Sequence, residues 1–258
     1  MNNRITQLFD KQKKNILSVF YTAGFPKLND TIEIACHLER AGAELIEIGI
    51  PFSDPVADGP TIQESNKIAL DNGMSLHLLI EQVKEIRKTV TLPIILMGYV
   101  NPVLQYGMKQ FVKDASAAGV DGLIIPDMPL AEFNEHYQDL FEEHNLSNTF
   151  LIAPTTSSDR IQQIDRASQG FIYAVSASST TGAKSDFSAE QISYFEKLKG
   201  IHLRNPFLIG FGISNQATFS KACEYGAGAI VGSAFVQLLK ASSNLERDII
   251  TFVKNIKG

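Results

Sequence analysis

The sequence predicts an α/β protein that forms one closed (β/α)8 barrel, the TIM barrel fold, with an extra helix at its N-terminus. Apolar runs suited to buried parallel strands alternate with helical patterns along the whole chain, and we count eight strand–helix units in 258 residues. That number and that length are those of a closed barrel. No Ser/Gly-rich linker or shift in composition divides the chain, so residues 1–258 are expected to form a single domain.

The polar segment before the first strand, which carries Arg4 and Lys11, is expected to be the extra helix. Each strand is predicted from a short run of mostly aliphatic and β-branched residues that Gly, Pro, Asp or Ser residues bound. Such near-continuous apolar runs are typical of parallel strands that are covered on both faces. They lie at 16–22, 44–49, 93–98, 121–126, 149–153, 170–175, 206–210 and 228–231.

The segments between these runs show helical periodicity, and several begin at Asn, Asp or Ser residues that can cap a helix. The expected helices are 29–41, 75–89, 107–118, 130–144, 157–168, 188–199, 214–225 and 244–256. Gly42, Gly119 and Gly226 mark turns from a helix into the next strand.

An open, doubly wound sheet is the alternative to a closed barrel. No glycine-rich dinucleotide fingerprint follows the first strand, and the strand count favours closure.

Composition excludes several classes of function. The formal net charge of −5 and the isoelectric point near 5.6 give no basic footprint for nucleic acid or an anionic membrane. The N-terminus has no signal peptide pattern, and no apolar run is long enough to cross a bilayer. We therefore expect a cytoplasmic protein.

Carboxylates gather at the end of the second expected strand. Glu47 lies inside the apolar run, and Asp54 and Asp58 follow in the loop. Burial of an ionised carboxylate is unfavourable and raises its pKa, which suits a group that gives and takes protons. From this segment alone, a structural Glu47 that pairs with a buried donor is an equal alternative.

Small residues end the last two expected strands, at 210–214 and 230–233, where backbone N–H groups can approach a ligand closely. Gly212, Gly232 and Ser233 therefore predict a phosphate site, with Ser233 opening a short helix whose N-terminus favours an anion. The alternative is that these glycines only make tight strand–helix turns.

Apolar and aromatic residues also fall at the expected strand ends, where a barrel enzyme places its site. They are Phe20, Met97, Ile124, Tyr173 and Phe211. Together they could wall a pocket for a flat aromatic group, although aromatic residues on strands usually belong to the core.

The sequence lacks the residues needed for two mechanisms that barrel enzymes use, metal catalysis and Schiff-base formation. The five histidines lie on or beside expected helices without the spacing of metal ligands, so no metal is expected. No lysine occupies a strand end, so a Schiff-base aldolase would have no nucleophile. Carboxylate acid–base chemistry on a phosphorylated substrate remains.

The motifs at the expected strand ends resemble those of the α subunits of tryptophan synthase, in the same order and over nearly the whole chain. The matching segments are 20–26, 47–61, 97–102, 125–129, 151–156, 173–182, 210–214 and 231–234. The stretch from Glu47 through Asp58 to Thr61 is the most specific of them, whereas the glycine pairs recur in many phosphate-binding barrels.

The resemblance implies retro-aldol cleavage of indole-3-glycerol phosphate to indole and glyceraldehyde 3-phosphate in L-tryptophan biosynthesis. By the family pattern, Asp58 accepts the indole N–H and Glu47 transfers protons at C3 and the hydroxyl. Other matched positions bind substrate. These are Phe20, Met97, Ile124 and Phe211 around indole, Tyr173 as a polar contact, Thr181 beside Asp58 in the closed state, and Gly182, Gly212, Gly232 and Ser233 at the phosphate.

The resemblance also implies a partner, a pyridoxal-phosphate-dependent β subunit in an αββα complex, to which indole passes. The α chain itself is expected to bind no cofactor.

One segment departs from the family. Many members have Ser-Arg-x-Gly-Val-Thr-Gly after the sixth strand, whereas this chain has Ser-Ala-Ser-Ser-Thr-Thr-Gly at 176–182. The loss of that Gly restricts the loop backbone, which puts the timing of closure and its coupling to the partner in question.

Two other functions stay open at this stage. A non-catalytic subunit could bind the phosphate and activate a partner enzyme, although a binding site has no need of a carboxylate inside a strand. A free-standing lyase could cleave the same substrate and release indole without a partner.

Overall fold

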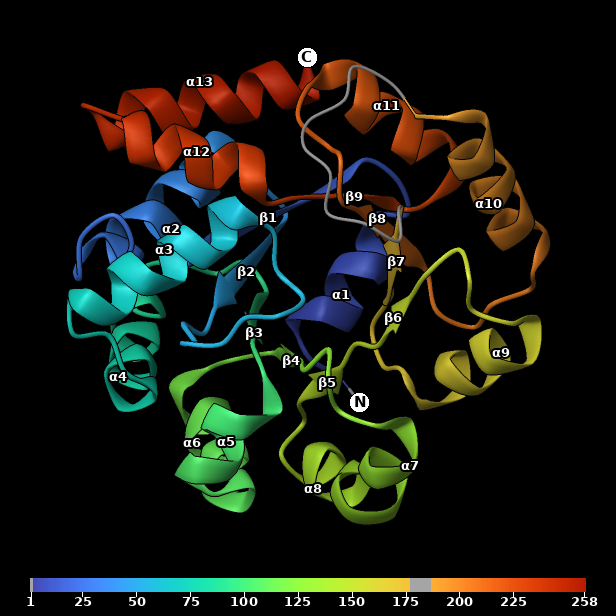
Figure 1. Cartoon of the computed structure of the whole chain (residues 1–258), viewed down its shortest axis with the longest axis horizontal. Helices are drawn as coiled ribbons and strands as arrows, with labels where there is room; N and C mark the ends of the chain where they lie inside the picture. The colour runs from blue at the N-terminus through green and yellow to red at the C-terminus, as the bar shows by residue number, and fades with distance from the viewer. Residues whose placement is uncertain (1, 177–186) are drawn as a thin grey trace.

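The computed structural model describes residues 2–176 and 187–258, in which parallel strands form a ring with helices around it (Figure 1). The strand order is β5-β4-β3-β2-β1-β9-β8-β7-β6. The strands are β1 (Ile16–Thr22), β2 (Leu45–Gly49), β3 (Ile94–Met97), β4 (Gly122–Ile124), β5 (Ser147–Asn148), β6 (Leu151–Ile152), β7 (Ile172–Val175), β8 (Phe207–Gly210) and β9 (Gly228–Val231). These bounds follow the sequence prediction closely except around residue 150.

The ring closes through the segment 147–152, which holds both ends of the sheet. Its first half, β5, pairs with β4, and its second half, β6, pairs with β7. Between them, the Thr149 N–H donates to Leu123 O at 3.1 Å and the Tyr173 N–H donates to Phe150 O at 3.0 Å. The fifth expected strand therefore begins two residues earlier than predicted and is divided in two, because its neighbours on the two sides pair with different halves. The predicted TIM barrel is confirmed.

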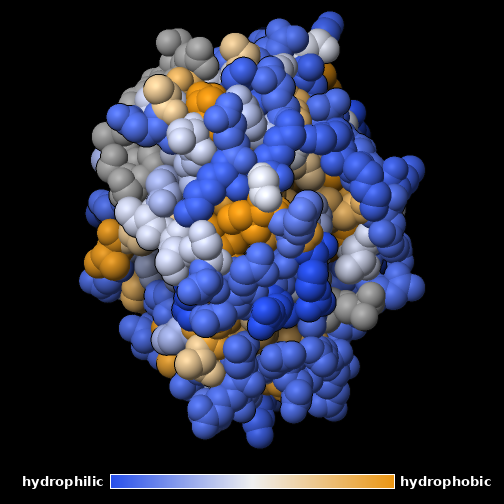
Figure 2. Space-filling view, turned by 90° about the vertical axis from the view of Figure 1, so that its right-hand side faces the viewer, coloured by the Kyte–Doolittle hydropathy of each residue, from blue (hydrophilic) through white to orange (hydrophobic). Residues whose placement is uncertain are grey.

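Helices cover the outside of the ring at nearly the predicted positions. They are α2 (Asp30–Ala41), α4 (Leu76–Ile86), α6 (Met108–Ala118), α7 (Leu130–Glu132), α8 (Gln138–Glu143), α9 (Ser158–Ala167), α10 (Ala189–Gly200), α11 (Gln216–Tyr225) and α13 (Leu245–Lys257). A π-helical turn, Phe133–Tyr137, joins α7 to α8 inside the helix expected at 130–144. Within the described ranges, no helix has the length and apolarity needed to cross a membrane. Figure 2 shows that the outer face on the side of α9 and α10 is mostly hydrophilic, with small apolar patches.

Three further helices lie between strands and the helices that cover them. The sequence analysis did not predict α3 (Pro60–Asp71) or α5 (Val100–Tyr106), whereas α12 (Ser233–Ala241) is the short helix expected to open at Ser233. Pro60 suits the first turn of α3 because its ring fixes φ and no intrahelical donor is needed there. The loop that follows β2 therefore spans residues 50–59, which is the Pro- and Asp-rich stretch itself.

Alternation along the strands separates two apolar cores. Outward-facing residues such as Val19 and Ile46 pack beneath the helices, while inward-facing ones such as Leu45 and Ile95 fill the barrel. The helix α1 (Arg4–Lys11), seen in the middle of the ring in Figure 1, adds Ile5 and Phe9 to the inner core. The ring of Phe9 lies 5.7 Å from that of Phe171, just before β7. The expected N-terminal helix thus closes the amino end of the barrel.

A buried ion pair joins α1 to the strands at this end. The Asp121 carboxylate, 3% exposed, accepts hydrogen bonds from the Ile94 N–H at 2.9 Å and from the guanidinium groups of Arg87 and Arg4. The Asn3 side chain donates to Asp121 O at 2.9 Å. Burial lowers the pKa of Arg87 to about 10, while the charge of Asp121 opposes this change. The pair therefore compensates two charges that would otherwise be buried alone.

We predict that Asp121→Asn lowers the free energy of unfolding by about 3–5 kcal/mol, because it leaves the Arg87 guanidinium buried without a counter-charge. Asp10→Asn is the matched control, since Asp10 is 86% exposed and lies 3.6 Å from Lys13. That control is expected to change stability by less than about 0.5 kcal/mol. Urea unfolding followed by circular dichroism measures both. Equal effects of the two substitutions would contradict a structural role for the buried pair.

Candidate active site

Glu47 lies on the inward face of β2 and is fully buried. Its register partners are Phe20 on β1 and Ile95 on β3. The Ser18 hydroxyl donates a hydrogen bond to Oε1 at 2.6 Å, whereas the buried Oε2 has no hydrogen-bond partner among the described residues. Burial raises the pKa of Glu47 from its ordinary 4.5 to about 7, against the opposing effect of the Ser18 bond. This carboxyl group can therefore both donate and accept a proton near neutral pH.

Asp58 lies in the loop between β2 and α3 and is half-buried. Burial raises the pKa of this carboxyl group to about 6, and a hydrogen bond from the Tyr99 hydroxyl opposes the rise. The same Tyr99 hydroxyl accepts a hydrogen bond from the Ala57 N–H at 3.0 Å. Burial and the charge of Asp58 raise the pKa of Tyr99 to about 12, so it stays a neutral donor. Tyr99 thus holds the loop at two consecutive residues and orients Asp58.

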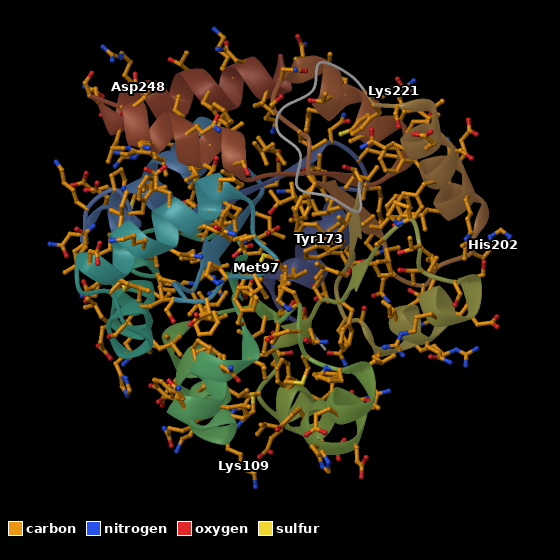
Figure 3. All side chains as sticks on the ribbon, in the orientation of Figure 1. Met97, Lys109, Tyr173, His202, Lys221 and Asp248 are labelled. Carbon is orange, nitrogen blue, oxygen red and sulfur yellow. The ribbon has the colours of Figure 1, made fainter. Side chains whose placement is uncertain are left out.

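Tyr173, on β7, lies within electrostatic reach of both carboxylates. It is 5% exposed, and its pKa lies well above the ordinary value because of burial and, secondarily, the charges of Glu47 and Asp58. Figure 3 shows the side chains of Tyr173 and Met97 near the centre of the ring, from β7 and β3. The ring of Tyr173 leaves no room for a side chain at Gly210, because a methyl group there would overlap its hydroxyl and ring.

The residues predicted to wall an aromatic pocket are brought to this end of the barrel. Ile124 and Tyr173 belong to the inner core, and Met97 and Phe211 pack against it. The rings of Tyr173 and Phe211 meet edge to face at 6.2 Å. Phe20 pairs in register with Glu47, and its ring lies beside Gly232 and against Gly49, where it leaves no room for a side chain. It also packs against residues of the outer core. The arrangement places apolar walls next to the two carboxylates.

The small-residue turns after β8 and β9 have the geometry of an anion site. Phe211 and Gly212 both adopt positive φ, at 67° and 80°. Gly232 precedes α12 and makes no side-chain cap, so the first N–H groups of that helix, from Ser233 on, can donate to a ligand. Two other predicted contacts, Thr181 and Gly182, lie outside the described residues.

Two residues of the site were missed by the sequence analysis, Ser18 and Tyr99. Ser18 is a polar residue in the apolar first half of β1, on the same face as Phe20, and this alternation was an available signal. Tyr99 lies in the segment 97–102 that the sequence analysis placed at the end of the third strand, but only the fold shows that its hydroxyl meets the loop of Asp58. The Asp127 Oδ1 accepts a hydrogen bond from the Val100 N–H at 2.9 Å, at the first residue of α5. Asp54 is exposed and accepts a hydrogen bond from Ser53.

A cavity of about 250 Å³ lies at the opposite, amino end of the barrel, between α1 and the segment 204–206. Its lining includes Phe9, which belongs to the closed end described above. In TIM barrels the chemistry lies instead at the carboxyl ends of the strands. The site is therefore assigned to the end that holds Glu47 and Asp58.

The fold and the site together define a class of protein, a TIM barrel that carries two carboxyl groups of raised pKa, the kind of group that acid–base chemistry requires. Residues 6–257 match the family model described as tryptophan synthase alpha chain. The tryptophan synthase alpha chain of Flavobacterium psychrophilum is 52% identical over 254 residues, which cover 98% of this chain and 99% of that protein. That of Parabacteroides distasonis is 53% identical over 241 residues, 93% and 94% of the two chains.

Solved structures agree with the sequence comparison. The crystal structure of tryptophan synthase subunit alpha from Legionella pneumophila matches with a TM-score of 0.89 and 31% identity, over 100% of this chain and 98% of that one. An aminoacrylate-bound tryptophan synthase from M. tuberculosis matches with a TM-score of 0.87 and 29% identity, over 99% and 98%. This chain belongs to the tryptophan synthase alpha chain family.

We predict that Glu47→Gln stabilises the protein at alkaline pH and has little effect near pH 4. A carboxyl group whose pKa is about 7 when folded and about 4.5 when unfolded keeps its proton longer in the folded state. Its contribution to stability is therefore full below pH 4.5 and is lost as pH rises through 7, by about 3 kcal/mol in all. The amide cannot ionise and avoids this loss.

Urea unfolding of both proteins from pH 4 to 9 measures the difference, with Asp54→Asn as the exposed control. The expected result is a gain for Glu47→Gln that grows between pH 4.5 and 7 and then levels off. A pH-independent difference would mean that Glu47 is not buried as an ionisable group.

Proposed function

We propose that this chain catalyses the retro-aldol cleavage of indole-3-glycerol phosphate to indole and glyceraldehyde 3-phosphate in L-tryptophan biosynthesis. Membership of the tryptophan synthase alpha chain family supports this reaction. The structural observation that carries it is Glu47, a fully buried carboxyl group with a pKa of about 7 among the inward-facing side chains of the barrel. A site built only to bind phosphate has no use for such a group.

The cleavage needs proton transfers that two carboxyl groups can provide. Protonated Glu47 delivers a proton to C3 of indole, and its carboxylate then removes the proton of the hydroxyl next to the bond that breaks. The C–C electron pair returns to the ring as the aldehyde forms. Asp58 accepts the indole N–H and stabilises the positive charge that develops on the ring after C3 is protonated. Ser18 holds one Glu47 oxygen and leaves the other for the substrate.

Substrate binding divides between the two regions of the site. In this proposal, indole lies among Phe20, Met97, Ile124 and Phe211, with Tyr173 as a polar contact. The phosphate binds the backbone N–H groups of Gly212, Gly232 and Ser233, and the family pattern adds Gly182, with Thr181 as the partner of Asp58. The open N-terminus of α12 and the positive φ of Gly212 support the phosphate placement.

The proposal includes a partner, a β subunit in an αββα complex that receives indole. The family name, alpha chain, supports this assembly. The loop that carries Asp58 also exposes Val56, which is 88% accessible and available to another protein. Proton transfer alone accounts for the cleavage, so this chain is proposed to use no cofactor, and pyridoxal phosphate belongs to the β subunit. A cytoplasmic location is in keeping with a biosynthetic family.

The test is indole release from indole-3-glycerol phosphate by the purified chain, alone and with a β subunit. Glu47→Gln and Asp58→Asn are each expected to reduce kcat by at least about 100-fold, since each removes a proton-transfer or charge-stabilising group. Asp54→Asn, an exposed carboxylate on the same loop, is the control and should leave turnover of the isolated chain unchanged. The β subunit should accelerate the wild-type chain.

Other outcomes identify the alternatives. Rapid turnover that a β subunit does not change would indicate a free-standing lyase. Absence of cleavage both with and without the partner would contradict the proposed reaction and leave a binding subunit.

A further inference from the structure

Phe211 has an unusual backbone conformation at the centre of the proposed substrate site. Its φ of 67° lies in the left-handed region, which a bulky L-residue rarely occupies and which costs about 1–3 kcal/mol. It directly follows β8 and precedes Gly212. Because such a conformation persists only where neighbouring groups impose it, the contacts of Phe211 show what holds the turn.

The Ser176 hydroxyl is the group that holds this peptide. Ser176 directly follows β7 and is 1% exposed. Its N–H donates to Gly210 O at 3.0 Å, and its Oγ donates to Phe211 O at 2.6 Å. The Ser176 hydroxyl thereby adds one hydrogen bond beyond the backbone ladder between β7 and β8, and this bond holds the strained residue Phe211.

Gln191, in the first turn of α10, fixes the direction of that hydroxyl bond. Its Nε2 donates to Ser176 Oγ at 3.3 Å. A hydroxyl has one proton, so when its oxygen accepts from Gln191 the proton is free to go to the Phe211 carbonyl. The other end of the amide makes the helix cap, because Oε1 accepts from the Ser188 N–H at 2.8 Å. One side chain therefore caps α10 and orients Ser176.

Fixing the Phe211 carbonyl also fixes the N–H of Gly212, since both belong to one planar trans peptide and point in opposite directions. Gly212 is a proposed phosphate donor, and the side chain of Phe211 is a proposed wall of the indole pocket. We propose that Ser176 and Gln191 are positioning residues that aim the Gly212 N–H at the substrate phosphate and set the Phe211 ring. This inference rests on the proposed function of the site and names residues that do not themselves contact substrate.

Gln191→Glu tests the inference with little structural change. The new carboxylate can still accept from the Ser188 N–H, and a glutamate at this position of a Ser-capped helix makes a favourable capping box. It cannot donate to Ser176, and as the stronger acceptor it draws the hydroxyl proton away from the Phe211 carbonyl. Stability should hold while the peptide between Phe211 and Gly212 loses its orientation.

The measurements are KM and kcat with indole-3-glycerol phosphate, and the calorimetric Kd of glycerol 3-phosphate, a phosphate-bearing fragment of the substrate. Gln191→Glu is expected to raise KM and Kd about tenfold and to change kcat less than about twofold, with an unchanged thermal midpoint. Ser176→Ala should have a similar effect, and the double variant should be no weaker than Ser176→Ala alone, because both changes break one chain of bonds. Ser176→Thr keeps the hydroxyl and should restore most of the affinity.

Ser193→Glu is the charge control, because it adds the same negative charge to an exposed position of α10, two residues further on. An equal rise in Kd for this control, or unchanged binding in Gln191→Glu, would overturn the inference. A wild-type chain that binds glycerol 3-phosphate but does not cleave indole-3-glycerol phosphate would contradict the proposed reaction only, and the Kd series would still decide the positioning role. Failure of the wild-type chain to bind glycerol 3-phosphate would overturn both the phosphate subsite and this inference.

Discussion

The closure of the parallel strands into a ring governs the rest of this molecule, because it forces every second side chain of each strand into one small interior. Leu45, Glu47 and Gly49 alternate with the outward-facing Ile46 and Ile48 on β2, so the carboxyl group has no route to solvent through the wall of the barrel. The helix α1 closes the amino end. Glu47 and the loop of Asp58 lie toward the other, carboxyl end.

This constraint gives the two carboxyl groups different environments. Glu47 is carried by a rigid strand, fully buried and held by Ser18, whereas Asp58 is carried by a loop, half-buried and held by Tyr99. Burial raises both pKa values, toward 7 and 6 respectively. A strand position suits a group whose pKa must stay near 7, because the rigid strand cannot move to expose the carboxyl group to water. A loop position suits the role proposed for Asp58, whose placement would adapt to the substrate and to a partner protein.

The turn after β8 also depends on the packing of the closed barrel. A left-handed Phe211 is tolerated because β7 ends beside it and supplies the Ser176 hydroxyl, which α10 orients in turn through Gln191. The strain is local, but the groups that oppose it come from three elements. The geometry of this turn thus depends on the packing of β7, β8 and α10 together, and a change in any one of them reaches the backbone that is proposed to bind the phosphate.

The sequence by itself determined the number and order of the strand–helix units, because burial on both faces demands long apolar runs and turns demand Gly, Pro and Asp. It also placed Glu47, Asp58 and the residues predicted to line a pocket, from Phe20 to Phe211, at one end of the barrel, since strand ends can be located along a chain. The tertiary structure alone decided the division of the segment 147–152 between two neighbours, the support of Asp58 by Tyr99 and the restraint of Phe211 by Ser176. Those contacts join residues that are distant in sequence, and no local pattern encodes which side chains meet when a ring of strands closes.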